Sequence, residues 1–327
     1  GVLVLRWRAR AAKASRECWL RRVSESPLLY ECPDFLSPAE CEAVVGAALM
    51  NGKRRLGSGE WEVKYDLDPW PEQAPGLLPD QRSVLESVFE RVDALCGVTR
   101  HAEEQPPRVH FYAPIRSCAV GRMPLGLHVD TNGRPHRFVT VIIYLTEVPH
   151  GGDGATAFPC ADDAATAKIG RDLLASGTQH SENLADHEHA PMSKALLAAA
   201  ERNSGISVRP ELGKLALFFT RLGDGAVDGA SWHGGARVRP EGGSEGKWIL
   251  QFFKEIPVRY RSGDAKARFC AARRRLPEFT LHGVSHRLGP PAVDSPAGAT
   301  AVEWGSTWRG LSAFAEQLEN ARNGHKC

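Results

Sequence analysis

Residues 124–159 constrain this chain more than any other part of its sequence. They contain the triplet His128-Val-Asp130, a turn-like TNGRP segment, and then residues 138–145, a run of eight apolar or β-branched residues. Such a run has the length and composition of a buried strand. In an extended segment alternate side chains point to the same face, so the imidazole of His128 and the carboxylate of Asp130 would lie side by side. The sequence therefore predicts two metal ligands next to a buried strand.

A metal site of this kind needs a further ligand, and His233 is in a suitable place. Residues 214–220 predict another strand, a loop rich in Gly and Asp follows, and the chain then reads SWHGG around His233. Residues 247–254 predict a third strand. Two histidines and one carboxylate on one face of an iron leave its opposite face open, which characterises non-haem Fe(II) oxygenases. Zinc accepts the same ligands, so a zinc hydrolase or isomerase stays an alternative.

Five motifs follow one another in an order that resembles a known family. They are His128-x-Asp130, RFVTVIIYLTEV with ATAFP, VRPELGKLALFF, SWHGG and GKWILQFF. Together they resemble the prolyl 4-hydroxylase branch of the 2-oxoglutarate- and Fe(II)-dependent dioxygenases, over about residues 27–255. The segment PLLYECPDFLSPAEC, residues 27–41, is similar to the opening strand and helix of that family.

The resemblance implies a mainly β fold with bracing helices. This fold is a double-stranded β-helix, or jelly roll, in which two facing sheets enclose the metal, and the strand-rich pattern and turn spacing agree with it. We expect residues 1–26 to be an N-terminal segment, 27–256 the dioxygenase domain, and 257–327 a C-terminal extension with a linker and a terminal helix. The Ala-rich, charged residues at about 161–204 make the interval between Asp130 and His233 longer than is usual in the family and predict a helical insertion.

The resemblance also implies a reaction. His128, Asp130 and His233 would bind Fe(II), with 2-oxoglutarate as cosubstrate and ascorbate as a further cofactor. The enzyme would hydroxylate an unactivated C–H bond, in the first place on a prolyl residue of a protein or peptide, and release succinate and CO2. The scaffold does not select the substrate, so a lysyl residue, a free amino acid or a nucleobase stays an alternative, as does a jelly-roll binding module without catalysis.

The far carboxylate of 2-oxoglutarate needs a cation in a dry pocket. Three cations follow His233 in the chain: Arg237, Arg239 and Lys247. In the pattern of the family a lysine begins the strand after the distal histidine and precedes a tryptophan, as Lys247 does. Both arginines come before the Gly-rich PEGGSEG loop, where a solvated or substrate-facing charge is more typical. We therefore expect Lys247 to bind this carboxylate.

Composition narrows the choice of partners. The net charge of +2 over 327 residues gives no long-range field that would select a nucleic acid or a membrane. We expect no membrane segment in this chain, because it has no apolar run near the roughly 20 residues that span a bilayer. Eight scattered cysteines without a Cys-x-x-Cys pair indicate neither a zinc ribbon nor a compact disulfide scaffold. Compartment and oligomeric state stay open.

Three smaller features allow simpler interpretations. The basic residues 268–275 are more typical of a solvated helix face than of a nucleic-acid site. Many family members place a tyrosine for 2-oxoglutarate shortly before the His-x-Asp pair, where this chain has Cys118, and Tyr112 comes earlier. Histidines of the insertion are more typical of a solvated loop than of a second metal site; these are His180, His187 and His189.

Overall fold

The computed structural model describes residues 2–8, 15–57, 61–115, 123, 126–179, 190–202, 204–240 and 244–274. All of them belong to one compact unit, Gly1–Val284. Several predicted features lie outside the described residues: Cys118, the three histidines of the insertion, and the linker and terminal helix near the C-terminus.

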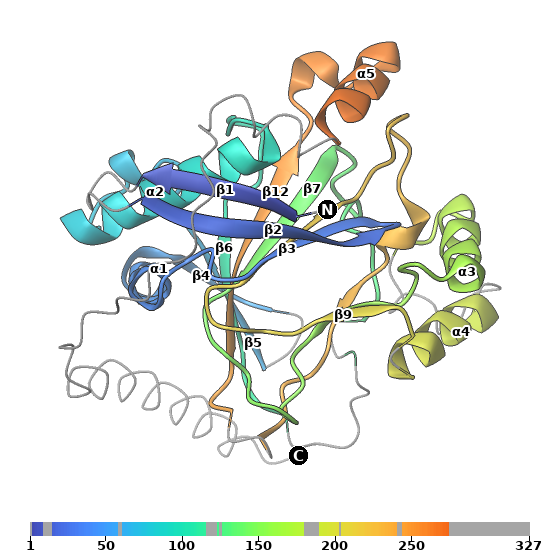
Figure 1. The fold of residues 1–327 in the computed structure, drawn as a ribbon, viewed down its shortest axis with the longest axis horizontal. Helices are drawn as coiled ribbons and strands as arrows, with labels where there is room; N and C mark the ends of the chain where they lie inside the picture. The colour runs from blue at the N-terminus through green and yellow to red at the C-terminus, as the bar shows by residue number, and fades with distance from the viewer. Residues whose placement is uncertain are drawn as a thin grey trace. The chain divides into compact units, whose positions relative to one another are not determined.

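A nine-stranded antiparallel sheet forms most of the fold (Figure 1). In spatial order its strands are β1 (Val2–Arg8), β2 (Ser15–Glu25), β3 (Leu28–Cys32), β10 (Leu215–Phe219), β7 (Arg137–Tyr144), β12 (Lys247–Glu255), β6 (Arg108–Tyr112), β5 (Glu62–Asp66) and β4 (Lys53–Leu56). A smaller sheet consists of β11 (Gly234–Gly235), β8 (Thr156–Phe158) and β9 (Ile206–Val208). Residues before 27, predicted as a separate segment, thus form β1 and β2 and extend the large sheet through β3.

From β6 onward the chain passes several times from one sheet to the other. The segment between β6 and β7 pairs at His128 with His233, immediately before β11 of the small sheet. The chain then continues with β7 in the large sheet, β8 and β9 in the small one, β10 in the large, β11 in the small and β12 in the large. Eight strand segments distributed in this way over two sheets make a jelly roll. The predicted mainly β, double-stranded β-helix fold is confirmed.

Alternation along β12 separates a packing face from a cavity face. Phe252 meets Phe89 of helix α2 (Pro79–Cys96) edge-on, with 5.2 Å between ring centroids. Trp248 packs on Phe111 of β6 with centroids 4.7 Å apart. The residues that alternate with Trp248 and Phe252 along the strand line a cavity of about 260 Å³ on the other side of the sheet; they are Lys247, Ile249, Gln251 and Phe253.

Helix α1 (Pro38–Asn51) begins with a capping box formed by Ser37 and Glu40. The backbone N–H of Glu40 donates to Ser37 Oγ at 3.2 Å, and the backbone N–H of Ser37 donates to Glu40 Oε2 at 2.7 Å. Two N–H groups that the helix itself cannot satisfy are thus bonded. Helix α2 ends at Gly97, whose φ of 61° is accessible to glycine without steric cost.

Replacement of Ser37 by alanine is expected to lower the free energy of unfolding by about 1 kcal/mol, because the N–H of Glu40 loses its side-chain acceptor. Urea denaturation followed by circular dichroism measures the change. The control is Ser207→Ala on β9, where the side chain is exposed and the change should stay within about 0.5 kcal/mol. Equal losses in both variants would contradict the capping role.

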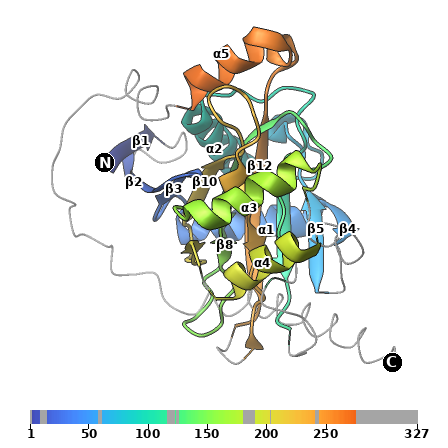
Figure 2. The ribbon, with the colours of Figure 1, turned by 90° about the vertical axis from the view of Figure 1, so that its right-hand side faces the viewer.

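Two helices occupy the part of the chain predicted as an insertion, α3 (Ala164–Ala175) and α4 (Ala190–Glu201). They lie side by side in Figure 2, and Figure 1 places them on the opposite side of the sheets from α1. Trp232 is fully buried, and its Nε1–H donates to the carbonyl of Gly170 in α3 at 3.0 Å. Helix α3 therefore supports the segment that carries His233.

The remaining described elements are short. They are the 3-10 turns η1 (Pro71–Gln73), η3 (Gly229–Ser231) and η5 (Val258–Tyr260) and the helix α5 (Gly263–Arg273), which contains part of the basic residues 268–275. None of the described helices combines the length and the apolar character that crossing a membrane requires.

Candidate active site

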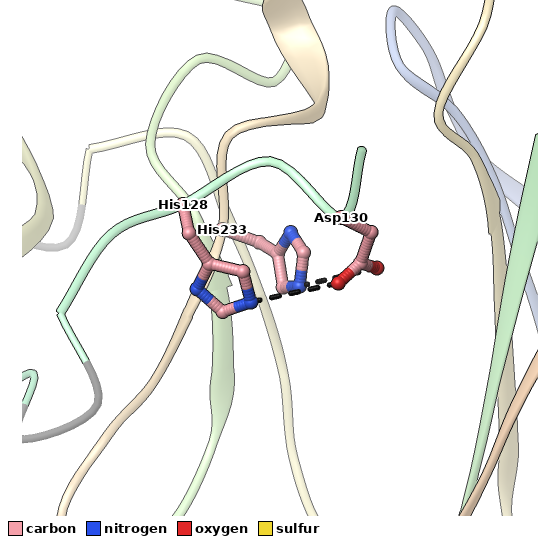
Figure 3. Close-up of side chains that lie close together, drawn as sticks. All are labelled: His128, Asp130 and His233. Carbon is pink, nitrogen blue, oxygen red and sulfur yellow. Dashed lines mark ion pairs between the residues drawn. The ribbon is translucent and has the colours of Figure 1, made fainter. Parts of the chain in front are cut away.

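His128, Asp130 and His233 meet between the two sheets, with their side chains pointing toward one another (Figure 3). The backbones of the two histidines are paired, because the N–H of each donates to the carbonyl of the other, at 2.9 and 3.0 Å. Asp130 lies 3.5 Å from His128 Nε2 and 3.6 Å from His233 Nε2, measured from its two carboxylate oxygens. The structure thus brings the three predicted ligands together, with ligand atoms within 4.8 Å of one another.

Asp130 is buried and is held ionised. Thr140 Oγ1 on β7 donates to its Oδ2 at 2.6 Å, and Arg137 Nη1 donates to its backbone carbonyl at 2.7 Å. Burial by itself would raise the pKa of this carboxyl group, but the imidazoles of His233 and His128 outweigh burial and lower the pKa well below its usual range. A carboxylate oriented in this way offers an anionic oxygen to a cation.

His233 is oriented by its surroundings. Its Nδ1 lies 3.0 Å from the carbonyl of Ser231, to which it donates as N–H, so the lone pair is on Nε2. Phe218 meets the imidazole edge-on at 4.6 Å, and Phe158 stacks on it at 5.5 Å. Burial lowers the pKa of His233 to about 4, which keeps the ring neutral at pH 7. A neutral imidazole with a fixed tautomer is the form that binds a metal.

The three donors fit an Fe(II) ion. Two imidazole nitrogens and one carboxylate oxygen that converge from one side leave the other side of a metal accessible. The side chain of His128 is 25% exposed while those of Asp130 and His233 are 1% and 4% exposed, so the accessible side is the side of His128. Within the described ranges, this is the group of His, Cys, Asp and Glu side chains that could hold one ion.

Lys247 faces the same cavity as the three metal ligands. The side chain is buried, its Nζ donates to the carbonyl of Gly154 at 2.7 Å, and it lies 4.8 Å from the ring centroid of Tyr112. Burial lowers the pKa of Lys247 to about 8, although Asp153 and Glu62 act in the opposite direction. An ammonium group in these surroundings provides a charged donor for one end of a dicarboxylate.

The other two cations considered from the sequence lie elsewhere. Arg239 lines a separate cavity of about 430 Å³, together with Gly151, Asp153 and Arg209. Arg237 is not among the residues that line either cavity. Of the three sequence candidates, Lys247 alone shares a described cavity with His128, Asp130 and His233.

Sequence reasoning missed the part of the cavity wall that β5 and β6 provide. Tyr112, left unassigned above, lies directly opposite Lys247 in the sheet. His110 is buried in the same wall, and its Nδ1 lies 3.1 Å from both Glu62 Oε1 and Tyr112 Oη. Polar residues at positions 108, 110 and 112 alternate with apolar ones in RVHFY, and this period-two pattern was the available signal.

Comparison with known proteins gives one curated relative and several solved structures, whereas no family model matches. "Probable prolyl 4-hydroxylase 3" of Arabidopsis thaliana is 22% identical over 238 residues, which are 71% of this chain and 72% of the relative. A viral collagen prolyl hydroxylase of Paramecium Bursaria Chlorella virus-1, solved with 2-oxoglutarate, is 13% identical to this chain with a TM-score of 0.37. The match covers 72% of this chain and 99% of the viral chain. A Pseudomonas putida prolyl-4-hydroxylase is 16% identical to this chain with a TM-score of 0.35, and the match covers 70% of this chain and 92% of the Pseudomonas putida chain.

The family likeness rests on the sequence relative and on features of this chain itself. Five motifs occur in the order typical of the family, and the two sheets have jelly-roll connectivity. The three predicted ligands form one buried cluster that shares a cavity with Lys247. These observations agree with one another: the chain is similar in sequence to a prolyl 4-hydroxylase and has a jelly-roll fold with a His-Asp-His cluster.

Proposed function

We propose that this protein hydroxylates a prolyl residue of a protein or peptide, with Fe(II), 2-oxoglutarate and O2 as co-reactants and ascorbate as a reductant for the iron. The observation that carries the proposal is that His128, Asp130, His233 and Lys247 line one cavity. The choice of a prolyl substrate comes from the similarity to prolyl 4-hydroxylases. Residues 27–256 are proposed as the catalytic domain, because they contain every strand from β3 to β12.

Each residue has a defined task in this proposal. His128, Asp130 and His233 would hold Fe(II) from one side, and Lys247 would bind the far carboxylate of 2-oxoglutarate. Ile142 and Ile249 add apolar surface to the wall, which favours exclusion of water from the pocket. With both groups bound, decarboxylation of 2-oxoglutarate by O2 supplies the oxidising power, one oxygen atom enters succinate, and the other enters the substrate C–H bond.

Purified protein supplied with Fe(II), ascorbate and 2-oxoglutarate is expected to produce succinate, and to produce more of it with a proline-containing peptide from a panel. Succinate and peptide masses are measured by mass spectrometry, and metal-free protein is the control. Zn(II) in place of Fe(II) separates the oxygenase from the zinc alternative, since zinc has no redox chemistry. Absence of succinate above the control with Fe(II) would reject the oxygenase activity, and hydroxylation of lysine or of a free amino acid instead would reject the prolyl substrate.

A further inference from the structure

A second cavity, of about 430 Å³, lies on the outer face of the small sheet, and we call it the outer groove. Ser207 of β9 lines it, whereas the next residue, Val208, is fully buried and pairs with Thr156 of β8, which lines the cavity of the candidate active site. Successive side chains of a strand point to opposite faces, so the two cavities lie on opposite faces of the small sheet. None of the described residues lines both cavities.

Two arginines line the outer groove. Arg209 directly follows β9, and Arg239 comes from the segment after β11, where its backbone N–H donates to the carbonyl of Gly152 at 2.9 Å. In the described part of the chain neither guanidinium forms an ion pair, and the Nε of Arg239 is buried without a hydrogen-bond acceptor. Because a guanidinium group is not deprotonated in proteins, both charges are permanent. Among the described residues they have no counter-ion.

Arg209 is oriented by a neutral acceptor. Its Nη1 lies 2.7 Å from Nδ1 of His150. A guanidinium group has only donors, so His150 accepts through the lone pair of Nδ1 and carries its proton on Nε2. This contact fixes one side of the guanidinium group without neutralising its charge. The other N–H groups of Arg209 have no acceptor within the described ranges and can donate to a ligand.

Asp153 is the acidic residue among the described residues of the groove, and it pairs with neither arginine. Its Oδ1 accepts the backbone N–H of Ala155 at 3.4 Å, and its charge acts against burial on the pKa of Lys247. Lys247 itself donates to the carbonyl of Gly154, the next residue after Asp153. Asp153 therefore belongs to the segment that holds Lys247, and the charges of the two arginines are left for a ligand.

Small side chains leave room beside these arginines; they belong to Gly151, Ala155, Gly205 and Ser207. A Cβ atom added at Gly151 would meet nothing within 4 Å, so the space next to this residue is open. Ser207 is exposed, and a hydroxyl group can donate a hydrogen bond to an anion. The volume of the groove lies within the range of small-molecule sites, about 300–1,000 Å³. The groove therefore has the size and the charge to hold a small anionic molecule.

We propose that the outer groove binds a small organic molecule through an anionic oxygen group that Arg209 and Arg239 contact. The strand order β11-β8-β9 places the two arginines on opposite sides of the segment that leads into β8, so the anion would lie between them. Guanidinium groups form charge-assisted hydrogen bonds with phosphate and carboxylate groups alike. Two sources therefore provide this chemistry: a phosphate ester or a carboxylic acid. The groove is separate from the cavity that contains Lys247, and the inference goes beyond the proposed oxygenase reaction.

Binding is measured by titration calorimetry under anaerobic conditions with three probes that share one carbon skeleton. Glycerol 3-phosphate presents a phosphate group, glycerate presents a carboxylate, and glycerol has no charge. At least one of the two anions is expected to bind with a Kd below about 1 mM, whereas glycerol should show no binding. The anion that binds more tightly identifies the group that the groove recognises. Its affinity should be the same with and without Fe(II) and 2-oxoglutarate, because these would occupy the other cavity.

Variants then connect the binding with the outer groove. Arg209→Gln and Arg239→Gln should each weaken it about tenfold or more, because each removes charge-assisted hydrogen bonds to the anion. Arg259→Gln makes the same change in net charge at an exposed arginine outside both cavities, and it should alter the affinity by less than about twofold. Ser207→Asp should abolish binding although both arginines stay, because it places a carboxylate in the groove, whereas its neutral match Ser207→Asn should retain binding.

Three results would each overturn this assignment: no binding of either anion by the natural protein, unchanged affinity in both arginine variants, or displacement of the anion by 2-oxoglutarate. The last result would place the anion in the cavity with Lys247. Near-ultraviolet circular dichroism shows whether each variant keeps its fold. If an arginine variant does not fold, Ser207→Asp and Ser207→Asn decide the question, and equal affinities of these two variants would reject the groove.

Discussion

Alanine at any one of His128, Asp130 or His233 is expected to reduce iron-dependent succinate formation by more than a hundredfold and to abolish stoichiometric iron binding. Loss of a residue that merely orients a metal ligand typically costs about 10- to 100-fold in metal affinity or activity, so loss of a ligand itself should cost more. Bound iron is measured by elemental analysis after gel filtration, and succinate by mass spectrometry.

Thr140→Val is the matched control for Asp130→Ala. It removes the hydroxyl that donates to Asp130 Oδ2 at 2.6 Å but leaves the carboxylate in place. We expect a partial loss, about 10- to 100-fold, in this variant and a larger loss in Asp130→Ala. The near-ultraviolet circular dichroism of each variant shows whether the fold survives. Full activity in any one alanine variant would remove that residue from the ligand set.

The large sheet could be predicted from the sequence to the extent that its strands are buried. Residues 138–145 form an apolar run that predicts a strand. The run is apolar because seven consecutive positions of β7, from Phe138 to Tyr144, are buried, and β7 lies between β10 and β12. The same reasoning applies to β10, all of whose residues are buried. Burial on both faces leaves a continuous apolar run that is visible in the sequence without knowledge of the partner strands.

The wall formed by β5 could not be predicted in the same way. The sequence around Trp61 mixes Gly, Pro and charged residues, a composition typical of a surface loop or hairpin. In the structure Glu62 and Lys64 lie in a strand that pairs with β6, and both face the cavity. Their burial depends on a tertiary contact with β6 and not on a local pattern, so periodicity contains no sign of it.

Arg137 shows a second limit of local patterns. Strict alternation from Thr140, which contacts Asp130, would turn Arg137 to the opposite face of β7. The pairing of β7 with β12 shifts register between Lys254 and Glu255, and Arg137 lines the cavity. A bulge of this kind reverses which face a residue occupies, and it arises from the pairing of two distant strands.

Lys247→Ala is expected to raise the KM for 2-oxoglutarate at least tenfold, a loss of about 1.4 kcal/mol, with a smaller effect on kcat at saturating cosubstrate. Hydrogen bonds to charged groups contribute about 1.5–3 kcal/mol each, and the ammonium group of Lys247 is buried, where water cannot replace it. The control is Arg239→Ala, which changes a cation outside this cavity and should leave KM unchanged.

The pH dependence of the natural protein provides an independent check on Lys247. Burial lowers its pKa to about 8, so the side chain is charged below pH 8 and becomes neutral as the pH rises through this value. The protonated form attracts a carboxylate, so KM for 2-oxoglutarate should be constant below pH 8 and should increase above it. Lys247→Ala has no such group, and its KM should not show this increase.

These two measurements together distinguish Lys247 from the nearby arginines, because a guanidinium group stays protonated throughout this pH range. If Arg237 or Arg239 bound the far carboxylate, KM would not increase above pH 8 for this reason. Alanine at that arginine would then raise KM at least tenfold, while Lys247→Ala would leave it unchanged. That combination of results would transfer the role to the arginine and show that the lysine in the cavity serves only to bind the carbonyl of Gly154.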